Sequence, residues 1–171
     1  MALIVEDGTG LPDAESYISV LDATAYHLKM GRKEAWALVG NEASKEAMLR
    51  RATQYLQSRY LGRWKGNPRV FTQVLDWPRT GVETRNMSFV SNAIVPEEVK
   101  AACAELALKA FSEDLMPDAT QTVKREKVGP LETEYDIYGT PSSKFESIDA
   151  MLSAYFSAGG TSPLNVPRVR T

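Results

Sequence analysis

Apolar residues recur every three or four positions along much of the chain, which is the spacing of one face of an α-helix. The pattern is clearest over residues 42–60, where apolar side chains would form one face and arginines and glutamines the other. The residues that share the apolar face are Leu49, Ala52, Thr53, Leu56 and Tyr60. The sequence therefore predicts a long amphipathic helix over this range.

A shorter helix is predicted to begin at about Ser19. Ser19 and Asp22 have the three-residue spacing of a capping box, with aspartate in the place of the usual glutamate. The apolar residues that fall on one face of this helix are Leu21, Ala25 and Leu28. Gly31 ends the helix, because glycine is the usual residue just past a helix C-terminus. A second short helix is expected over about residues 33–39.

Another helix is predicted to open at Pro96 and to run to about Leu115. It carries apolar residues on two faces: one holds Val99, Cys103, Leu106 and Ala110, and the other holds Ala104, Leu108, Phe111 and Leu115. A helix that is apolar on two sides either lies at the centre of a bundle or buries one side against a neighbouring subunit. The candidates for a subunit interface are Leu108, Phe111, Leu115 and Tyr135.

Three further segments are predicted: a β-ribbon, a long loop and a last helix. Residues 121–138 alternate between apolar and polar positions around a Gly-Pro turn, which predicts a two-stranded β-ribbon. Residues 61–95 are interrupted by glycines and prolines and predict a long irregular loop, a feature that is generally functional in a compact domain. A last helix is expected over about residues 143–156.

Together these elements predict a mainly α fold. It would be a small helical bundle of four to five helices with a two-stranded β-ribbon and an extended C-terminal arm. At 171 residues the chain is long enough for one domain with its own core. We assign the domain to residues 1–158 and the arm to residues 159–171.

Charge is distributed unevenly along the chain. There are 20 Lys and Arg against 22 Asp and Glu, yet six basic residues and no acidic one lie between Ala47 and Leu75. The six are Arg50, Arg51, Arg59, Arg63, Lys65 and Arg69. The rest of the chain therefore has 14 basic residues against 22 acidic ones. Such a basic block must face solvent, nucleic acid or an acidic partner.

Aromatic residues are interleaved with the basic block. They are Tyr55, Tyr60, Trp64 and Phe71. Cations and aromatic rings together are typical of single-strand binding, in which the rings stack on unpaired bases and the cations contact phosphates. The alternative is that the arginines only solvate a helix face, and Tyr60 in particular continues the apolar stripe of its helix. The mild overall acidity argues against non-specific coating of duplex DNA.

The sequence contains no catalytic or metal-binding constellation. A single cysteine, Cys103, and a single histidine, His27, exclude an internal disulfide and a histidine cluster. Cys103 lies on an apolar stripe, where cysteine behaves as a small buried hydrophobe. The signatures of phosphate-binding loops and nucleophile elbows are missing. We therefore expect no enzyme activity, no cofactor and no metal.

Neither a membrane span nor a signal peptide is expected. No apolar run approaches the roughly 20 residues that cross a bilayer. Glu6 interrupts the N-terminus before the core of a signal peptide could form. These features favour a protein that is made in the cytoplasm and stays in a compartment like it.

Four motifs carry a resemblance to a family of tailed-phage proteins: LRRATQYLQSRYLGRWKG, WPRTGV, VPEEVKAACAELALKA and KVGPLETEY. They occur in the family's order, and the likeness runs from about Ala2 to the final RVRT. The family is described in two ways, as head-tail connector (adaptor) proteins and as DnaT-like single-stranded-DNA-binding proteins. The two descriptions imply different functions.

The connector resemblance implies a structural protein of the virion, located in the neck at the capsid vertex and assembled in the host cytoplasm. The implied partners are copies of the chain in a ring, expected to be a dodecamer, the portal protein, the next neck or tail protein, and the genomic DNA in the channel. The residues of the arm that would bind the portal are Leu164, Val166, Arg168, Val169 and Arg170. The connector is the main hypothesis, and a DnaT-like single-stranded-DNA-binding protein is the alternative.

Overall fold

The computed structural model describes residues 2–84, 86–116, 125–128, 131–134 and 145–157. Its helices are α1 (Val20–Lys29), α2 (Lys33–Ala37), α3 (Glu42–Tyr60), α4 (Glu97–Ser112) and α5 (Glu146–Leu152), and a 3-10 turn, Ser153–Tyr155, continues α5. The strands form two antiparallel pairs, β1 (Asn67–Pro68) with β2 (Arg79–Thr80) and β3 (Arg125–Val128) with β4 (Leu131–Glu134). The predicted mainly helical fold with a two-stranded ribbon is confirmed.

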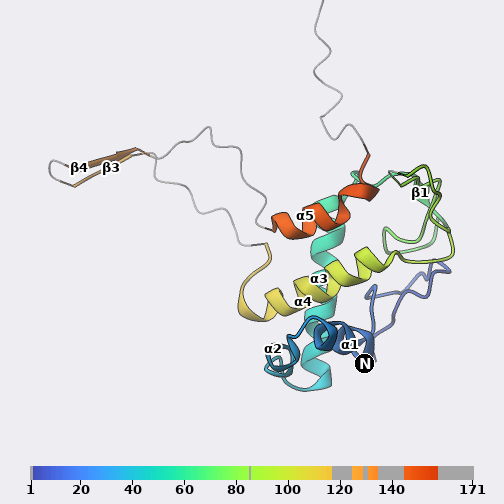
Figure 1. Cartoon of the computed structure of the whole chain (residues 1–171), viewed down its shortest axis with the longest axis horizontal. Helices are drawn as coiled ribbons and strands as arrows, with labels where there is room; N and C mark the ends of the chain where they lie inside the picture. Colours follow the sequence, from blue (N-terminus) through green and yellow to red (C-terminus); the bar gives the residue numbers. More distant parts are fainter. Residues whose placement is uncertain (1, 85, 117–124, 129–130, 135–144, 158–171) are drawn as a thin grey trace, which may run out of the picture.

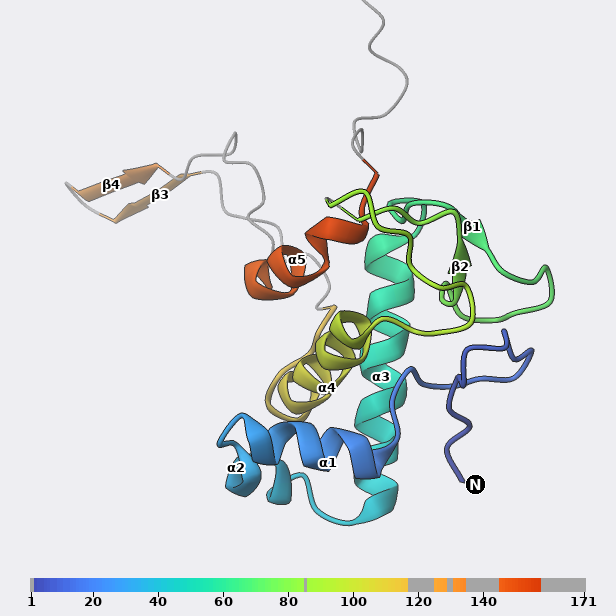
Figure 2. The same ribbon diagram turned by 45° about the vertical axis from the view of Figure 1, so that its right-hand side comes forward.

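The long helix α3 runs through the middle of the bundle, and α4 packs across it (Figures 1 and 2). α1 and α2 lie near the N-terminal end of α3, and α5, β1 and β2 lie toward its C-terminal end. α3 begins where the sequence predicts, because the Asn41 side chain accepts a hydrogen bond from the Ser44 amide at 2.9 Å. The Ser19 side chain caps α1 in the same way through the Asp22 amide, at 3.0 Å, which confirms Ser19 as the start of this helix. The Asp22 carboxylate accepts from the Ser19 hydroxyl at 2.7 Å, in place of the backbone contact of a capping box.

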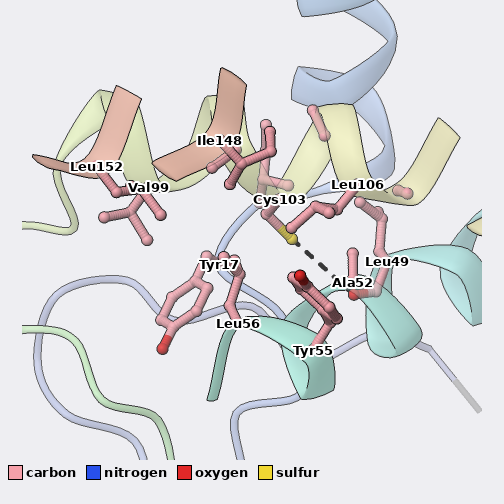
Figure 3. Packing of buried hydrophobic residues seen from close by; sticks show 14 of the residues in the cluster. Tyr17, Leu49, Ala52, Tyr55, Leu56, Val99, Cys103, Leu106, Ile148 and Leu152 are labelled. Carbon is pink, nitrogen blue, oxygen red and sulfur yellow. Dashed lines mark hydrogen bonds between the residues drawn. The ribbon is translucent and has the colours of Figure 1, made fainter. Parts of the chain in front are cut away.

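The core forms where α3 and α4 meet (Figure 3). Leu49 and Leu56 of α3 are fully buried, as are Cys103 and Leu106 of α4. The Cys103 Sγ lies 3.9 Å from the Leu49 carbonyl oxygen. The thiol thus fills space between the two helices as a small apolar group, as the sequence predicts.

α4 is central because its own chain covers one of its apolar faces fully and the other in part, with Phe111 left 49% exposed. It contacts α1, α3 and α5. The residues that α4 buries are Val99, Ala102, Cys103, Ala104, Glu105, Leu106, Ala107 and Ala110. Of the two interpretations of a two-faced helix, the structure therefore favours the centre of a bundle. The helix ends at Ser112, three residues earlier than the predicted end.

α1 buries a different face from the one that carries its leucines. Ala23 and His27 are buried, whereas Leu21 and Leu28 are 78% and 58% exposed. The apolar face formed by Leu21, Ala25 and Leu28 therefore lies on the surface of the protein.

The ribbon strands pair in the predicted antiparallel arrangement. Arg125 lies opposite Glu134 and Lys127 opposite Glu132. The strands cover the centre of the predicted 121–138 segment, and the rest of that segment lies outside the described residues. The arm over 159–171 also lies outside them. No helix in the described part of the chain combines the length and the apolar character needed to cross a membrane.

Candidate functional site

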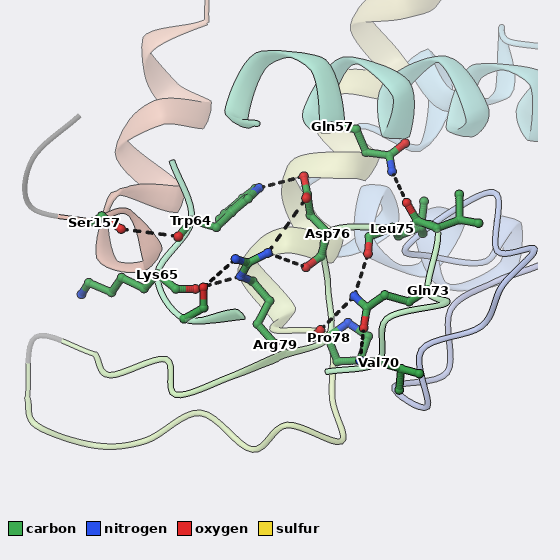
Figure 4. A network of polar contacts seen from close by, with 12 residues as sticks. Gln57, Trp64, Lys65, Val70, Gln73, Leu75, Asp76, Pro78, Arg79 and Ser157 are labelled. Atoms are coloured by element: carbon green, nitrogen blue, oxygen red, sulfur yellow. Dashed lines mark hydrogen bonds and ion pairs between the residues drawn. The ribbon is translucent and has the colours of Figure 1, made fainter. Parts of the chain in front are cut away.

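Residues 61–95, which we call the lobe, are held together from inside by one arginine. Arg79 is buried, and its guanidinium donates hydrogen bonds to the carbonyl oxygens of Lys65, Gly66 and Asp76 at 2.8, 2.7 and 3.1 Å (Figure 4). The carbonyls of two segments, Lys65–Gly66 and Asp76, converge on one cation, so a loop with little secondary structure acquires a fixed shape. Trp64 Nε1 donates to the Asp76 carboxylate at 3.1 Å, and burial raises the pKa of this carboxyl group.

An aromatic layer joins the lobe to the helices. Trp64 packs edge-on against Trp77, with ring centroids 5.7 Å apart, and also against Tyr60 at 5.6 Å. Phe156 stacks on Tyr60 at 5.0 Å. Tyr60, Trp64 and Trp77 are all buried. The interpretation of Tyr60 and Trp64 as core residues is therefore confirmed, and neither ring can serve as a stacking platform in this conformation.

The segment that follows α5 pairs with the start of the lobe. The Lys65 amide donates to the Tyr155 carbonyl, and the Ser157 amide donates to the Arg63 carbonyl, each at 2.9 Å. The Lys65 Nζ donates to the carbonyls of Ala154 and Glu83, each at 2.8 Å. The backbone around Lys65 is consequently fixed between the end of α5 and the lobe.

The structure divides the basic block into two parts. In the first part, Arg50 forms ion pairs with Glu15 at 2.9 Å and with Glu46 at 3.4 Å. Arg51 donates to the Ala110 carbonyl at 3.0 Å. It also forms an ion pair with Asp114 at 3.8 Å. The charges of Arg50 and Arg51 are thus already balanced by carboxylates of the same chain.

The second part lies at the C-terminal end of α3 and in the lobe. It consists of Arg59, Arg63, Lys65 and Arg69, which we call the basic end. No carboxylate in the described part of the chain forms a salt bridge with any of the four. Arg63 instead covers the Phe156 ring at 4.5 Å, and Arg69 donates to the Gly8 carbonyl at 2.5 Å. Among the described residues, the four positive charges of the basic end therefore have no ion-pair partner.

Two phenylalanines of the lobe point into solvent. Phe71 is 102% exposed and Phe89 is 75% exposed. The sequence marks Phe71 only as one of four aromatic residues in the basic block. Its exposure depends on the fold of the lobe, which has no periodic pattern from which the position of a side chain could be predicted.

Cys103 and His27, the residues considered for chemistry, each contact other groups of the core. The Cys103 Sγ lies 3.4 Å from the Thr53 hydroxyl, and burial raises the pKa of the thiol. His27 Nε2 lies 3.1 Å from the Ala104 carbonyl, to which it donates, and burial lowers the pKa of the imidazole. Within the described residues, no group of three or more His, Cys, Asp or Glu side chains could hold a metal ion. The absence of enzyme activity stays a prediction.

The candidates for a subunit interface occupy different environments. Leu115 is buried in its own chain, Leu108 is partly buried against the core, and Phe111 is 49% exposed. Tyr135 and the arm residues Leu164, Val166, Arg168, Val169 and Arg170 lie outside the described residues. Of the four candidates, only Phe111 is seen to offer a large exposed surface, and the interface role stays a prediction.

Fold and surface together define a small helical domain with four cations, at the C-terminal end of α3 and in the lobe, that form no salt bridge with a described carboxylate. Residues 1–171 match the model of the protein family described as "Putative DnaT-like ssDNA binding protein", and the chain belongs to that family. The comparisons with curated proteins and with solved structures found no match. The DnaT-like resemblance is thus confirmed, and nothing in the comparisons supports the head-tail connector.

Proposed function

We propose that this protein binds single-stranded DNA and that the basic end is the surface that contacts the phosphates. The observation that carries the proposal is that Arg59, Arg63, Lys65 and Arg69 lie together in the chain without a salt bridge to a described carboxylate. A cation that is already paired gains little from a phosphate, because the first ion pair must be broken. A cation that contacts only carbonyl oxygens or an aromatic ring keeps its charge, so it can bind a phosphate without first breaking an ion pair. The family description supports the choice of single-stranded DNA as the ligand.

The distribution of charge sets the strength of this binding. The chain as a whole has a formal net charge of −2, so the acidic remainder weakens long-range attraction to a polyanion. Binding then depends on a small number of local contacts. With four phosphates neutralised, the logarithm of the binding constant should fall against the logarithm of salt concentration with a slope of about −3.

The experiment measures this slope by fluorescence anisotropy with a labelled oligothymidylate of about 15 nucleotides. Replacing Arg59 and Arg69 by glutamine should reduce the slope to about −1.5 and weaken binding at low salt. Both side chains are exposed, so the double variant should retain the fold. The matched control makes the same replacement at Lys29 and Lys33, which are exposed in α1 and α2 at the other end of α3. This control variant should leave the slope unchanged.

Two results would refute the proposal. One is the absence of salt-dependent binding by the unchanged protein. The other is an equal loss of binding in the control variant, because this would mean that any surface cation contributes and that the basic end has no special role.

A structural connector of a phage neck is the second candidate function, and the exposed apolar face of α1 favours it. Leu21 and Leu28 of this face are exposed, and Leu38, which directly follows α2, is also 73% exposed. Single-strand binding at the basic end does not use this face, whereas assembly with other copies or with a portal would bury it.

The connector function predicts a stable complex when the protein is mixed with portal rings. Deleting residues 161–171 should abolish that complex while the helical fold, followed by circular dichroism, remains. If the portal rings bind nothing and the oligonucleotide binds at physiological salt, the connector function is refuted.

A further inference from the structure

Phe71 is an aromatic side chain that the fold presents to solvent in full. Its exposed fraction of 102% equals that of a ring with no neighbours. Phe111, the exposed phenylalanine of α4, still has half of its surface covered. A phenylalanine in this position contributes nothing to the core, so its apolar face is available to a partner.

The turn that carries Phe71 is held by hydrogen bonds on both sides of the ring. The Gln73 side chain accepts from the Val70 amide at 2.9 Å and donates to the carbonyls of Leu75 and Pro78 at 2.7 and 3.0 Å (Figure 4). The glutamine thereby ties the two ends of the turn together. The backbone of the turn is already ordered in the free protein, so a partner that contacts Phe71 would not have to order it.

Contacts from other parts of the chain fix the same turn in place. The Val74 amide donates to the Leu11 carbonyl at 3.3 Å, and the Val74 carbonyl accepts from the Gln57 side chain of α3 at 2.8 Å. At the other end, the Arg69 amide donates to the Pro78 carbonyl at 3.1 Å. The ring of Phe71 therefore stands on a rigid support that is joined to α3.

The charges around the turn indicate what kind of partner fits. Arg69 lies two residues before Phe71, is exposed, and belongs to the basic end. A flat apolar ring beside unpaired cations is complementary to a ligand with flat apolar faces and negative charges. An unpaired nucleotide has both, whereas the bases of a duplex are stacked on each other and present their phosphates alone.

Phe89 is the other largely exposed ring of the lobe, and its surroundings are less suitable for this ligand. Its bridge partner in the hairpin is Glu83, an exposed carboxylate. A phosphate would be repelled there. The combination of a fully exposed ring and an adjacent unpaired cation is therefore found at Phe71.

We propose that Phe71 is a stacking site for an unpaired base and that it gives the protein its preference for single strands over duplex. The inference rests on the proposed function and assigns separate tasks to two parts of the same surface. The basic end contacts phosphates of either kind of DNA. Phe71 adds an interaction that only an unpaired base can make.

The test compares Phe71→Ala with the unchanged protein on a labelled oligothymidylate and on a duplex of the same length. Loss of one base-stacking contact should weaken single-strand binding roughly 5- to 150-fold. Duplex binding and the slope against salt should stay the same, because the cations are untouched. The melting temperature should also stay the same, since the side chain is fully exposed.

Two matched variants sharpen the test. Phe71→Trp should keep the single-strand affinity, and its additional fluorescence should be quenched by the oligonucleotide. Phe111→Ala removes an exposed phenylalanine that is followed by Glu113 and Asp114, and it should bind like the unchanged protein. Equal single-strand affinity of Phe71→Ala and the unchanged protein would overturn this inference alone. Failure of the unchanged protein to bind either DNA would overturn the proposed function as well.

Discussion

His27 is a buried imidazole whose surroundings favour the neutral form. Nε2 donates to the Ala104 carbonyl, and the ring packs against Trp36 with centroids 4.7 Å apart. Nδ1 is buried and has no hydrogen-bond partner among the described residues. Burial lowers the pKa of His27, and Arg32 lowers it further, although Glu105 and the Ala104 carbonyl oppose the shift. The folded protein therefore resists protonation at this site.

The lowered pKa makes stability depend on pH. The unfolded chain protonates His27 near its ordinary pKa of about 6.5, whereas the folded protein does so only at lower pH. Below about pH 6.5 the unfolded state therefore binds more protons, and the free energy of unfolding falls as the pH falls. We expect the melting temperature to decline between about pH 7 and pH 5.5, which calorimetry can measure.

The variant His27→Phe separates this effect from the titration of carboxyl groups. Phenylalanine keeps an aromatic ring beside Trp36 but cannot be protonated. The variant should lose the pH dependence between about pH 7 and pH 5.5 even if it is less stable at neutral pH. A decline of equal size in the variant and the unchanged protein would assign the pH dependence to other groups.

Individual residues show where prediction from sequence ends. The basic block is visible in the sequence, but the partners of its arginines are not. Arg50 is neutralised by Glu15, 35 residues away, and Arg69 is bound by the Gly8 carbonyl, 61 residues away. Such contacts depend on the tertiary fold. The sequence could therefore propose six basic site residues but could not separate the four without salt bridges from the two that are paired.

At the scale of elements, the positions of the helices and of the irregular loop were predicted well, but the buried face of a helix was not always predicted. The bounds of α3 match the prediction, because its apolar stripe is long and Asn41 provides a cap. The two-sided pattern of α4 also predicted its central position as one of two alternatives. In α1, however, the leucine face is exposed and the face with His27 is buried. Packing against α4 determines which face of α1 is buried, and the sequence of α1 alone does not reveal this.

The lobe is an irregular element whose shape depends on one side chain, Arg79, and substitutions of Arg79 test this dependence. Replacing Arg79 by alanine removes three hydrogen bonds to backbone carbonyls and should destabilise the lobe by on the order of 3 kcal/mol. Arg79→Lys should also destabilise the lobe, because an ammonium group cannot reproduce the forked hydrogen-bond geometry of the guanidinium. Hydrogen exchange should become faster in residues 61–84 than in α4. The exposed Arg59→Ala is the control, and equal exchange in both variants would refute this role for Arg79.

At the scale of the whole molecule, the helices and the lobe share one core. Buried residues run without a break from Trp36 beside α1, through Leu49 and Leu56 of α3, to Trp64 and Trp77 in the lobe. The end of the described chain closes this arrangement, because the Tyr155 hydroxyl donates to Glu98 of α4 at 2.7 Å while its ring contacts Trp77. A lobe attached in this way should not unfold by itself. The basic end would then keep its geometry for as long as the helices remain folded.

Chemical denaturation can measure this cooperativity, because the tryptophans lie in both regions. The variant Trp36→Phe removes the tryptophan near α1 and leaves Trp64 and Trp77, so its fluorescence reports on the lobe alone. Circular dichroism reports on the helices. Since the two regions share buried residues, we expect both signals to change in a single transition with the same midpoint. The variant itself should cost at least about 1 kcal/mol, because the Thr24 hydroxyl loses its 2.8 Å hydrogen bond from Trp36 Nε1 and the smaller ring leaves a cavity at a buried position. A fluorescence change that is complete before the helices unfold would show that the lobe is a separate unit. The rigidity that supports Phe71 would then have to come from the hydrogen bonds of the lobe alone.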